Sequence, residues 1–334
     1  MQFRLRYLVV PLVVLGLVAS VLWAWPTDAY VFSPDKAKPL AEHVQVPGAH
    51  PVGSGDVYYV DAFIGKASLL ERILPFTRPD GSSLVPAQRY LSPGITDRQR
   101  RHQVVEEMQR STQIAPAVAL RALGRKVDAT ATGIVVIGVI GGTPASGKLQ
   151  EGDVLVAVDG APVRTPDELR AAIGRRRPGQ RVRLTVRRGG SMTRVRLRTI
   201  ADPQRPTRPI VGIQVDQEAT IKLPIKITID LGRVGGPSAG LPFALEIVRM
   251  LGRNVTHGCR IAATGELALD GSVLPVGAVK QKTIGARRTG VDVFLVPAGE
   301  NAETARSNAG GLRIEPVETF QQALHVLATR PPKC

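Results

Sequence analysis

The sequence is poor in aromatic side chains and in cysteine. Aromatic residues make up 4% of the 334 residues and are not interleaved with the basic ones, so no platform for stacked nucleic-acid bases is indicated. Neither Cys259 nor Cys334 belongs to a CxxC pair or a Cys/His cluster, and the sequence therefore predicts neither a metal site nor a cofactor. One disulfide is compatible with two cysteines, but we do not predict it, because Cys334 is the terminal residue.

The formal net charge is +16. Nucleic-acid binding is one interpretation of such a charge. Because the basic residues are spread along the chain, we predict no nucleic-acid partner; a membrane-tethered nucleic-acid binder remains an alternative that rests on charge alone. Attraction to anionic lipid headgroups is the simpler account of the charge.

The first thirty residues contain a long uncharged stretch at positions 7–25. A helix of about 20 apolar residues spans the hydrocarbon core of a bilayer. Arg4 and Arg6 precede the stretch and Trp23 and Trp25 close it, which predicts a cytoplasmic N-terminus. We therefore expect residues 1–30 to form a cytoplasmic tip and a transmembrane anchor of a single-pass cell-membrane protein, with the rest of the chain extracytoplasmic. A cleaved signal peptide is the alternative.

Residues 31–127 are predicted to form a membrane-proximal region. A strand is expected at 56–64, and the capping box of Thr96 and Gln99 predicts a helix to about residue 112. A second short helix should begin at Pro116. No residue pattern in this region indicates chemistry, so we interpret it as packing or spacing.

Residues 128–200 are predicted to form a separate β-rich module of strands around one helix. The stretch TPASGKLQEGDVLVAVDGAPVRTPDELRAAI resembles the PDZ domain family. Such domains bind peptide C-termini by adding a strand to a sheet edge. The resemblance places that peptide site at Thr132, Gly133 and Ile134. The proline-containing stretch 201–209 then reads as a linker.

Residues 142–149 nearly match the phosphate-binding loop GxxxxGK[ST]. That motif requires a hydroxyl at its last position to hold magnesium, where this chain has Leu149. A strand pattern, rather than a helix, follows it. The sequence therefore predicts no ATP site.

The last predicted domain, 210–334, contains a glycine-rich turn at 235–240 between an alternating strand and an apolar helix. The start of a helix presents unpaired N–H groups, which stabilise negative charge. Ser238 in this turn is either a nucleophile or merely a helix N-cap. His257 and His325 lie in the same domain, but nothing in their local sequence aims them at Ser238.

A second element lies at 259–290, where a strand, a turn and a helix bearing Lys280 and Lys282 follow one another. GGPSAGL together with TGELALDGSVLPVGAVKQK resembles the proteolytic domain of Lon proteases. The resemblance implies a Ser–Lys dyad of Ser238 and Lys282, with Thr264 orienting the lysine. It places substrate and oxyanion binding at Gly236, Pro237 and Ala239.

A buried lysine acts as a base when desolvation lowers its pKa. The carboxylates nearest to Lys282 in sequence are Asp270 and Asp292, so an apolar surrounding without an acidic partner is expected. One departure from the family is visible, because Gly235 stands where many Lon domains have an acidic residue.

The whole arrangement resembles PDZ-containing Lon-like membrane proteases that lack an ATPase module. We therefore expect an α+β multidomain protein with an N-terminal transmembrane helix, a PDZ-like module and a C-terminal Lon-type α/β proteolytic domain. It would act as an ATP-independent serine endopeptidase on exported, unfolded or membrane-associated proteins, and the resemblance implies a hexamer. The alternative is a non-catalytic PDZ scaffold with a relict Lon-like domain.

Overall fold

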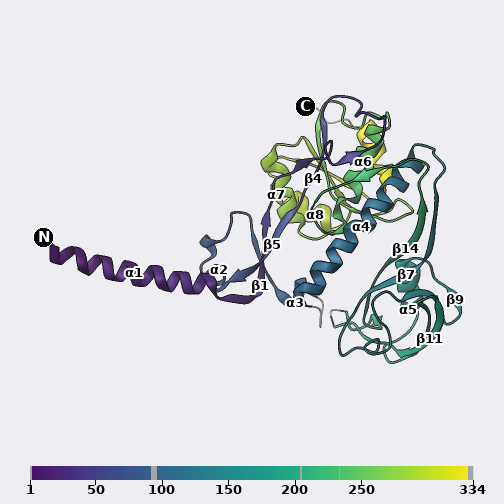
Figure 1. Ribbon diagram of the computed structural model, residues 1–334, viewed down its shortest axis with the longest axis horizontal. Coiled ribbons are helices and arrows are strands. Elements are labelled where there is room, and N and C mark those ends of the chain that lie inside the picture. Colours follow the sequence, from purple (N-terminus) through teal and green to yellow (C-terminus); the bar gives the residue numbers. More distant parts are fainter. Residues whose placement is uncertain (1, 92–95, 204, 233, 330–333) are drawn as a thin grey trace.

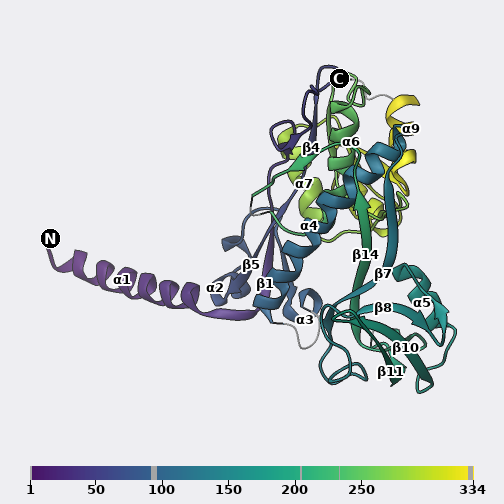
Figure 2. The same cartoon turned by 45° about the vertical axis from the view of Figure 1, so that its right-hand side comes forward.

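The computed structural model describes residues 2–91, 96–203, 205–232, 234–329 and 334. Helix α1 (Gln2–Ala24) projects away from the rest of the molecule in both views (Figures 1 and 2). In the described part of the chain, no helix combines the length and the apolar character that crossing a membrane requires.

This finding overturns the predicted transmembrane anchor at residues 1–30, and with it the single-pass, extracytoplasmic localisation. The prediction relied on the absence of charge between residues 7 and 25. Absence of charge is only one requirement, because a spanning helix must also be apolar over the whole hydrocarbon thickness.

The main body is a three-layer structure around a five-stranded sheet. The strand order is β2 (Lys38–Pro39), β4 (Asp56–Tyr59), β16 (Arg260–Ala263), β19 (Val293–Pro297) and β20 (Arg313–Val317), with only the β2–β4 pair antiparallel. Alternate residues of a strand point to opposite faces, so each face can bury its own set of side chains.

One face of this sheet packs against α4 (Asp97–Ala122), α6 (Gly240–Met250) and α9 (Phe320–Thr329), with Ile261 and Leu295 in that core. The other face packs against α7 (Val279–Thr289) and α8 (Glu300–Asn308), where Ala262 and Phe294 are buried. Both faces are covered, as is usual for parallel strands.

Much of the predicted membrane-proximal region belongs to this body. β2 and β4 are strands of its sheet, and α4 supplies Met108, Ile114 and Val118 to the core shared with α6 and α9. The predicted regions 31–127 and 210–334 therefore contribute to one core instead of forming two. The capping box of Thr96 and Gln99 is present, but α4 continues through Pro116 instead of ending before it.

The rest of the region before α4 forms a smaller layer. Strands β1 (Pro26–Pro34), β5 (Ala62–Ser68) and β6 (Ser83–Pro86) make an antiparallel sheet in the order β5-β1-β6. The short helices α2 (Leu69–Ile73), η1 (Pro75–Thr77) and α3 (Ala87–Tyr90) accompany it.

The β-rich module has a core of its own, in which Ile134, Leu155 and Leu184 are fully buried. Its main strands are β7 (Asp128–Val139), β8 (Val154–Val158), β10 (Arg181–Arg188) and β11 (Ser191–Arg198), and its helix is α5 (Pro166–Gly174). The sheet order is β11-β10-β8-β7-β14, where β14 (Ile213–Lys222) already leads back to the body. The module is thus inserted between α4 and β14, which Figure 2 shows as neighbours.

The remaining strands are short pairs. β9 (Ala161–Pro162) pairs with β8, β12 (Ile200–Ala201) with β13 (Pro209–Ile210), β15 (Thr228–Ile229) with β3 (Val44–Gln45), and β17 (Glu266–Leu267) with β18 (Val273–Leu274). The β12–β13 pair closes part of the predicted linker into the module. The two cysteines, Cys259 and Cys334, form a disulfide, a pairing that the sequence did not predict.

Candidate active site

Ser238 lies in the short 3-10 helix η2 (Pro237–Ala239), which leads directly into α6. Gly236 precedes it with φ of 92°, a conformation that favours glycine and turns the chain sharply into the helix. The loop is fixed from two sides: the Gly236 N–H donates to the Val104 carbonyl at 2.7 Å, and the Gly265 N–H donates to the Ser238 carbonyl at 2.9 Å. A side chain at Gly235 would press against Val104 of α4, since an added Cβ would lie 3.0 Å from its Cγ2. This contact gives a local reason for glycine at the position where many Lon domains carry an acid.

Lys282 lies on α7 and is only 4% exposed. Its ammonium nitrogen donates to the Thr264 hydroxyl at 3.2 Å, and that hydroxyl lies 3.3 Å from the Ser238 carbonyl oxygen, to which it donates. Thr264 is fully buried between the two. Ser238 and Lys282 both line one cavity of about 420 Å³. The structure therefore brings together the three residues that the sequence predicted from separate elements.

Burial is the main influence on the pKa of Lys282. Desolvation lowers the pKa of Lys282 to about 8, against a smaller upward effect of the charge on Asp61. Asp61 lines the same cavity, and its own pKa is raised because it is largely desolvated. A substantial fraction of Lys282 is then neutral near pH 8, which is the form that accepts a proton.

The predicted oxyanion donors are not equivalent. The Gly236 N–H already donates to Val104, and Pro237 has no N–H. Of the three predicted residues, only Ala239 keeps an N–H within η2, beside that of Ser238 itself. These two groups lie at the start of a helix, where N–H groups stabilise negative charge.

The cavity also contains charged residues that sequence reasoning missed. Asp61, Arg89, Arg100 and Glu107 come from the region interpreted as packing or spacing, and Glu266 belongs to the TGE motif itself. Burial, reinforced by nearby carboxylates, raises the pKa of Glu266 to about 7. For this part of the lining the sequence signal is the capping box before Asp97, because it predicts the helix that carries Arg100 and Glu107.

The histidines lie elsewhere. His257 and His325 are both exposed, and neither lines the cavity that contains Ser238. No histidine is among the described residues that line this cavity.

The predicted peptide site of the β-rich module does not have a free edge. Gly133 and Ile134 lie within β7, which pairs with β14 on one side and with β8 on the other. The side chain of Thr132 lies outside the described part. An added strand needs unpaired N–H and C=O groups. The two terminal strands of this sheet are β11 and β14, and β14 lies beside α5.

The near-match to a phosphate loop serves the core of this module. Leu149 is 5% exposed and packs in the module's hydrophobic cluster, and β8 follows the loop. An apolar contact thus replaces the magnesium-binding hydroxyl.

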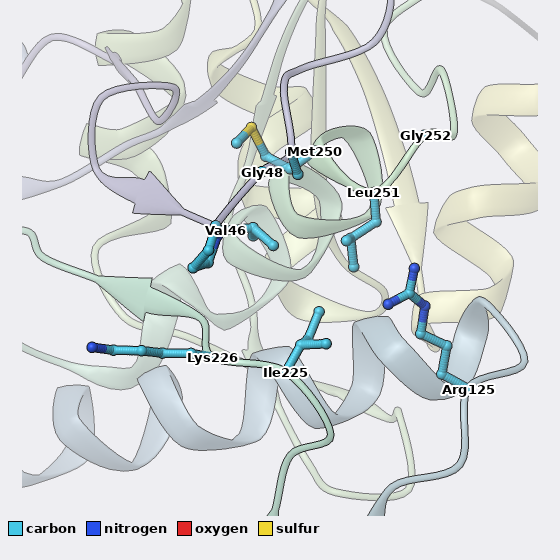
Figure 3. Close-up of a pocket in the computed structure, with 10 residues that line it drawn as sticks. Val46, Gly48, Arg125, Ile225, Lys226, Met250, Leu251 and Gly252 are labelled. Atoms are coloured by element: carbon cyan, nitrogen blue, oxygen red, sulfur yellow. The ribbon is translucent and has the colours of Figure 1, made fainter.

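A larger cavity of about 600 Å³ lies at the C-terminal end of α6 (Figure 3). The side chain of Leu251 points toward Ile225 across it, and Arg125 and Lys226 are its charged residues. Its described lining contains neither a hydroxyl nucleophile nor a carboxylate, so size alone does not make it the better candidate for catalysis.

Comparisons with known proteins identify two domains in the chain. Residues 210–330 match the Lon protease (S16) C-terminal proteolytic domain, and residues 121–199 match the PDZ domain. The chain therefore carries a Lon-type proteolytic domain and a PDZ domain, which confirms the resemblance inferred from the two sets of motifs.

Individual relatives match over limited lengths. The Lon protease of Mesomycoplasma hyopneumoniae is 35% identical over 117 residues, which are 33% of this chain and 13% of that protein. The Lon protease of Desulforamulus reducens is 42% identical over 86 residues, which are 25% of this chain and 10% of the relative. The chain thus matches only about a tenth of the length of these curated relatives.

Among solved structures, the PDZ domain of an SdrC-like protein from Listeria monocytogenes is 24% identical, covering 26% of this chain and 90% of that one, with a TM-score of 0.24. A Geobacillus thermodenitrificans protein is 30% identical, covering 25% and 97%, also with a TM-score of 0.24.

Proposed function

We propose that this protein is a serine endopeptidase with a Ser238–Lys282 dyad that cleaves unfolded or flexible polypeptides without nucleotide. The observation that carries the proposal is the buried Lys282, whose pKa desolvation lowers to about 8 and which Thr264 links to the loop of Ser238. A serine hydroxyl needs a nearby base to become a nucleophile, and a neutral lysine can be that base.

In the proposed reaction, the neutral amine of Lys282 takes the hydroxyl proton of Ser238 as the serine oxygen bonds to the scissile carbonyl carbon. The N–H groups of Ser238 and Ala239 hold the resulting oxyanion. Protonated Lys282 then gives its proton to the leaving nitrogen as the C–N bond breaks. Water, deprotonated by Lys282, then adds to the acyl carbonyl carbon. Lys282 returns that proton to the Ser238 oxygen as the ester C–O bond breaks and the carboxylic acid leaves.

A relict, non-catalytic scaffold is the alternative function. Such a domain has no need of the buried Lys282–Thr264 contact, because desolvating a lysine costs folding free energy. The contact therefore supports the catalytic proposal over the scaffold. The PDZ domain would present polypeptides along the open edge of β14, and the hexamer implied by the resemblance stays a prediction.

The test of this function is cleavage of unfolded casein by the full chain without nucleotide. We expect cleavage that changes less than about twofold on adding ATP and Mg²⁺ or on chelating Mg²⁺, because Leu149 packs in the PDZ core instead of offering a magnesium ligand. Ser238→Ala serves as the inactive control. Several-fold stimulation by ATP would disprove nucleotide independence, and equal cleavage by Ser238→Ala would disprove the site.

Replacing Asp61 by asparagine should move the pH profile of cleavage to lower pH. The Asp61 charge raises the pKa of Lys282, so its removal favours the neutral amine at a given pH. The midpoint of the ascending limb of kcat/KM, measured on a short peptide between pH 6 and 10, should fall by about half a unit or more. Asp292→Asn, outside the cavity lining, is the matched control. A midpoint that stays in place in Asp61→Asn, or moves upward, contradicts the assignment.

A further inference from the structure

Helix α4 contacts both the PDZ domain and the loop of Ser238. Figure 2 shows α4 beside α6 and β14. The sequence of this region indicates only packing or spacing, and the described residues show that α4 contacts both the domain and the loop. The two kinds of contact come from two stripes along the helix, and each stripe repeats after seven residues, or about two turns.

The first stripe contacts the loop of the nucleophile. The Val104 carbonyl accepts from the Gly236 N–H at 2.7 Å, and the buried Ser111 hydroxyl donates to the Pro237 carbonyl at 3.2 Å. Their partners, Gly236 and Pro237, directly precede Ser238, so both contacts fix the turn that positions the serine.

The second stripe is displaced by one residue and contacts the PDZ domain. The amide nitrogen of Gln103, which is 4% exposed, donates to the Ile137 carbonyl of β7 at 2.9 Å and to the Gln214 side chain of β14 at 3.2 Å. Seven residues on, Arg110 forms an ion pair with Asp216 of β14, and both side chains are about four-fifths buried.

Adjacent residues on a helix differ by about 100° in direction, so the two stripes share one backbone segment. A rotation or shift of α4 that loosened Gln103 and Arg110 would also move Val104 and Ser111. We propose that Gln103 and Arg110 are positioning residues of the peptidase site, which hold α4 on the PDZ sheet so that Val104 and Ser111 fix the Ser238 loop. This inference rests on the proposed function, because it assigns the two residues a part in aiming Ser238.

The PDZ domain then has a part in catalysis that does not depend on substrate capture. Neither Gln103 nor Arg110 lines the catalytic cavity, so neither touches a bound substrate there. A short peptide that occupies only the cavity should still respond to their loss. Gln103 carries no charge, so its replacement leaves the electrostatics of the cavity unchanged.

The test uses the full chain with Gln103→Ala, Arg110→Gln and Arg110→Lys, and with Arg101→Gln as a matched control at an exposed position of α4. Two quantities are measured: hydrogen exchange of the segment 234–241, which contains the Gly236 N–H, and kcat and KM on a short peptide taken from a casein cleavage site. We expect exchange to become about tenfold faster and kcat to fall about tenfold with KM nearly unchanged in Gln103→Ala and Arg110→Gln, because small misplacements of reacting groups cost rate. Arg110→Lys should recover part of both.

Unchanged exchange and unchanged kcat in Gln103→Ala and Arg110→Gln would overturn the proposal. An equal loss in Arg101→Gln would overturn it too, because the effect would then belong to α4 in general. Thermal unfolding shows which variants are folded, and Arg110→Lys provides the milder change if Arg110→Gln is not. If the wild-type chain cleaves nothing, the proposed function fails, while the exchange measurement still decides whether α4 holds the loop.

Discussion

Lys282→Ala should abolish peptide cleavage, with a loss of at least about a thousandfold in kcat, while Lys280→Ala keeps most of it. In the proposed mechanism Lys282 takes the proton from the Ser238 hydroxyl and passes it to the leaving nitrogen, so its removal leaves the serine without activation. Lys282 lines the catalytic cavity with Ser238, whereas Lys280, two residues earlier on α7, does not. Positions two apart on a helix point about 200° apart, so only one of these lysines can face the serine.

The pH dependence gives this prediction a second signature. The neutral amine is the active form, and desolvation lowers the pKa of Lys282 to about 8. Activity should therefore be low near pH 6, rise through about pH 8 and level off above it. Lys280→Ala should keep this profile.

The measurement is kcat and KM on a short peptide for both variants between pH 6 and 10, after circular dichroism has shown that each is folded. Loss of activity in Lys280→Ala with retention in Lys282→Ala would move the base to Lys280. Full activity in both would reject the Ser–Lys mechanism.

The residues of the proposed dyad could be predicted from sequence because each lies in a compact local motif. Ser238 follows two glycines at a helix start, and Lys282 follows Thr264 without a gap in the resemblance. Both signals are short-range, so they survive without knowledge of the fold. The link through Thr264 is likewise consistent with the spacing of TGE and the second lysine.

Other parts of the site could not be predicted because they depend on contacts between distant segments. Asp61 is 221 positions from Lys282 in sequence. It follows β4, and the parallel pairing of β4 with β16 brings this segment next to the strand that leads to Thr264. The peptide edge was misplaced for the same reason. The alternation in β7 indicates a strand, but not that β14, more than 70 residues later, covers its free side.

The commitment of the Gly236 N–H to Val104 is a further long-range contact. The glycine-rich turn by itself indicates a set of free donors, and only the packing of α4 shows which of them is occupied. The predicted domain boundaries followed local composition. The core of the main body, in contrast, joins strands and helices from both sides of the inserted PDZ domain.

Gly285→Ala should lower the free energy of unfolding of the main body by about 3 kcal/mol or more, because overpacking a well-filled contact forces the backbone to move. Gly285 lies on α7, one turn after Lys282, and its backbone passes close to the carbonyl of Asp35. An added Cβ would lie 1.9 Å from that carbonyl oxygen, which is backbone and has no rotamer to change. The helix or the segment around Asp35 must therefore shift.

The matched control is Gly174→Ala on α5, where nothing lies within 4 Å of an added Cβ. That change should alter stability by no more than about 1 kcal/mol, in the stabilising direction, because alanine is the better helix former. Urea unfolding followed by circular dichroism measures both variants. A Gly285→Ala chain that unfolds at the wild-type urea concentration would show that the segment around Asp35 is not packed against the helix of Lys282.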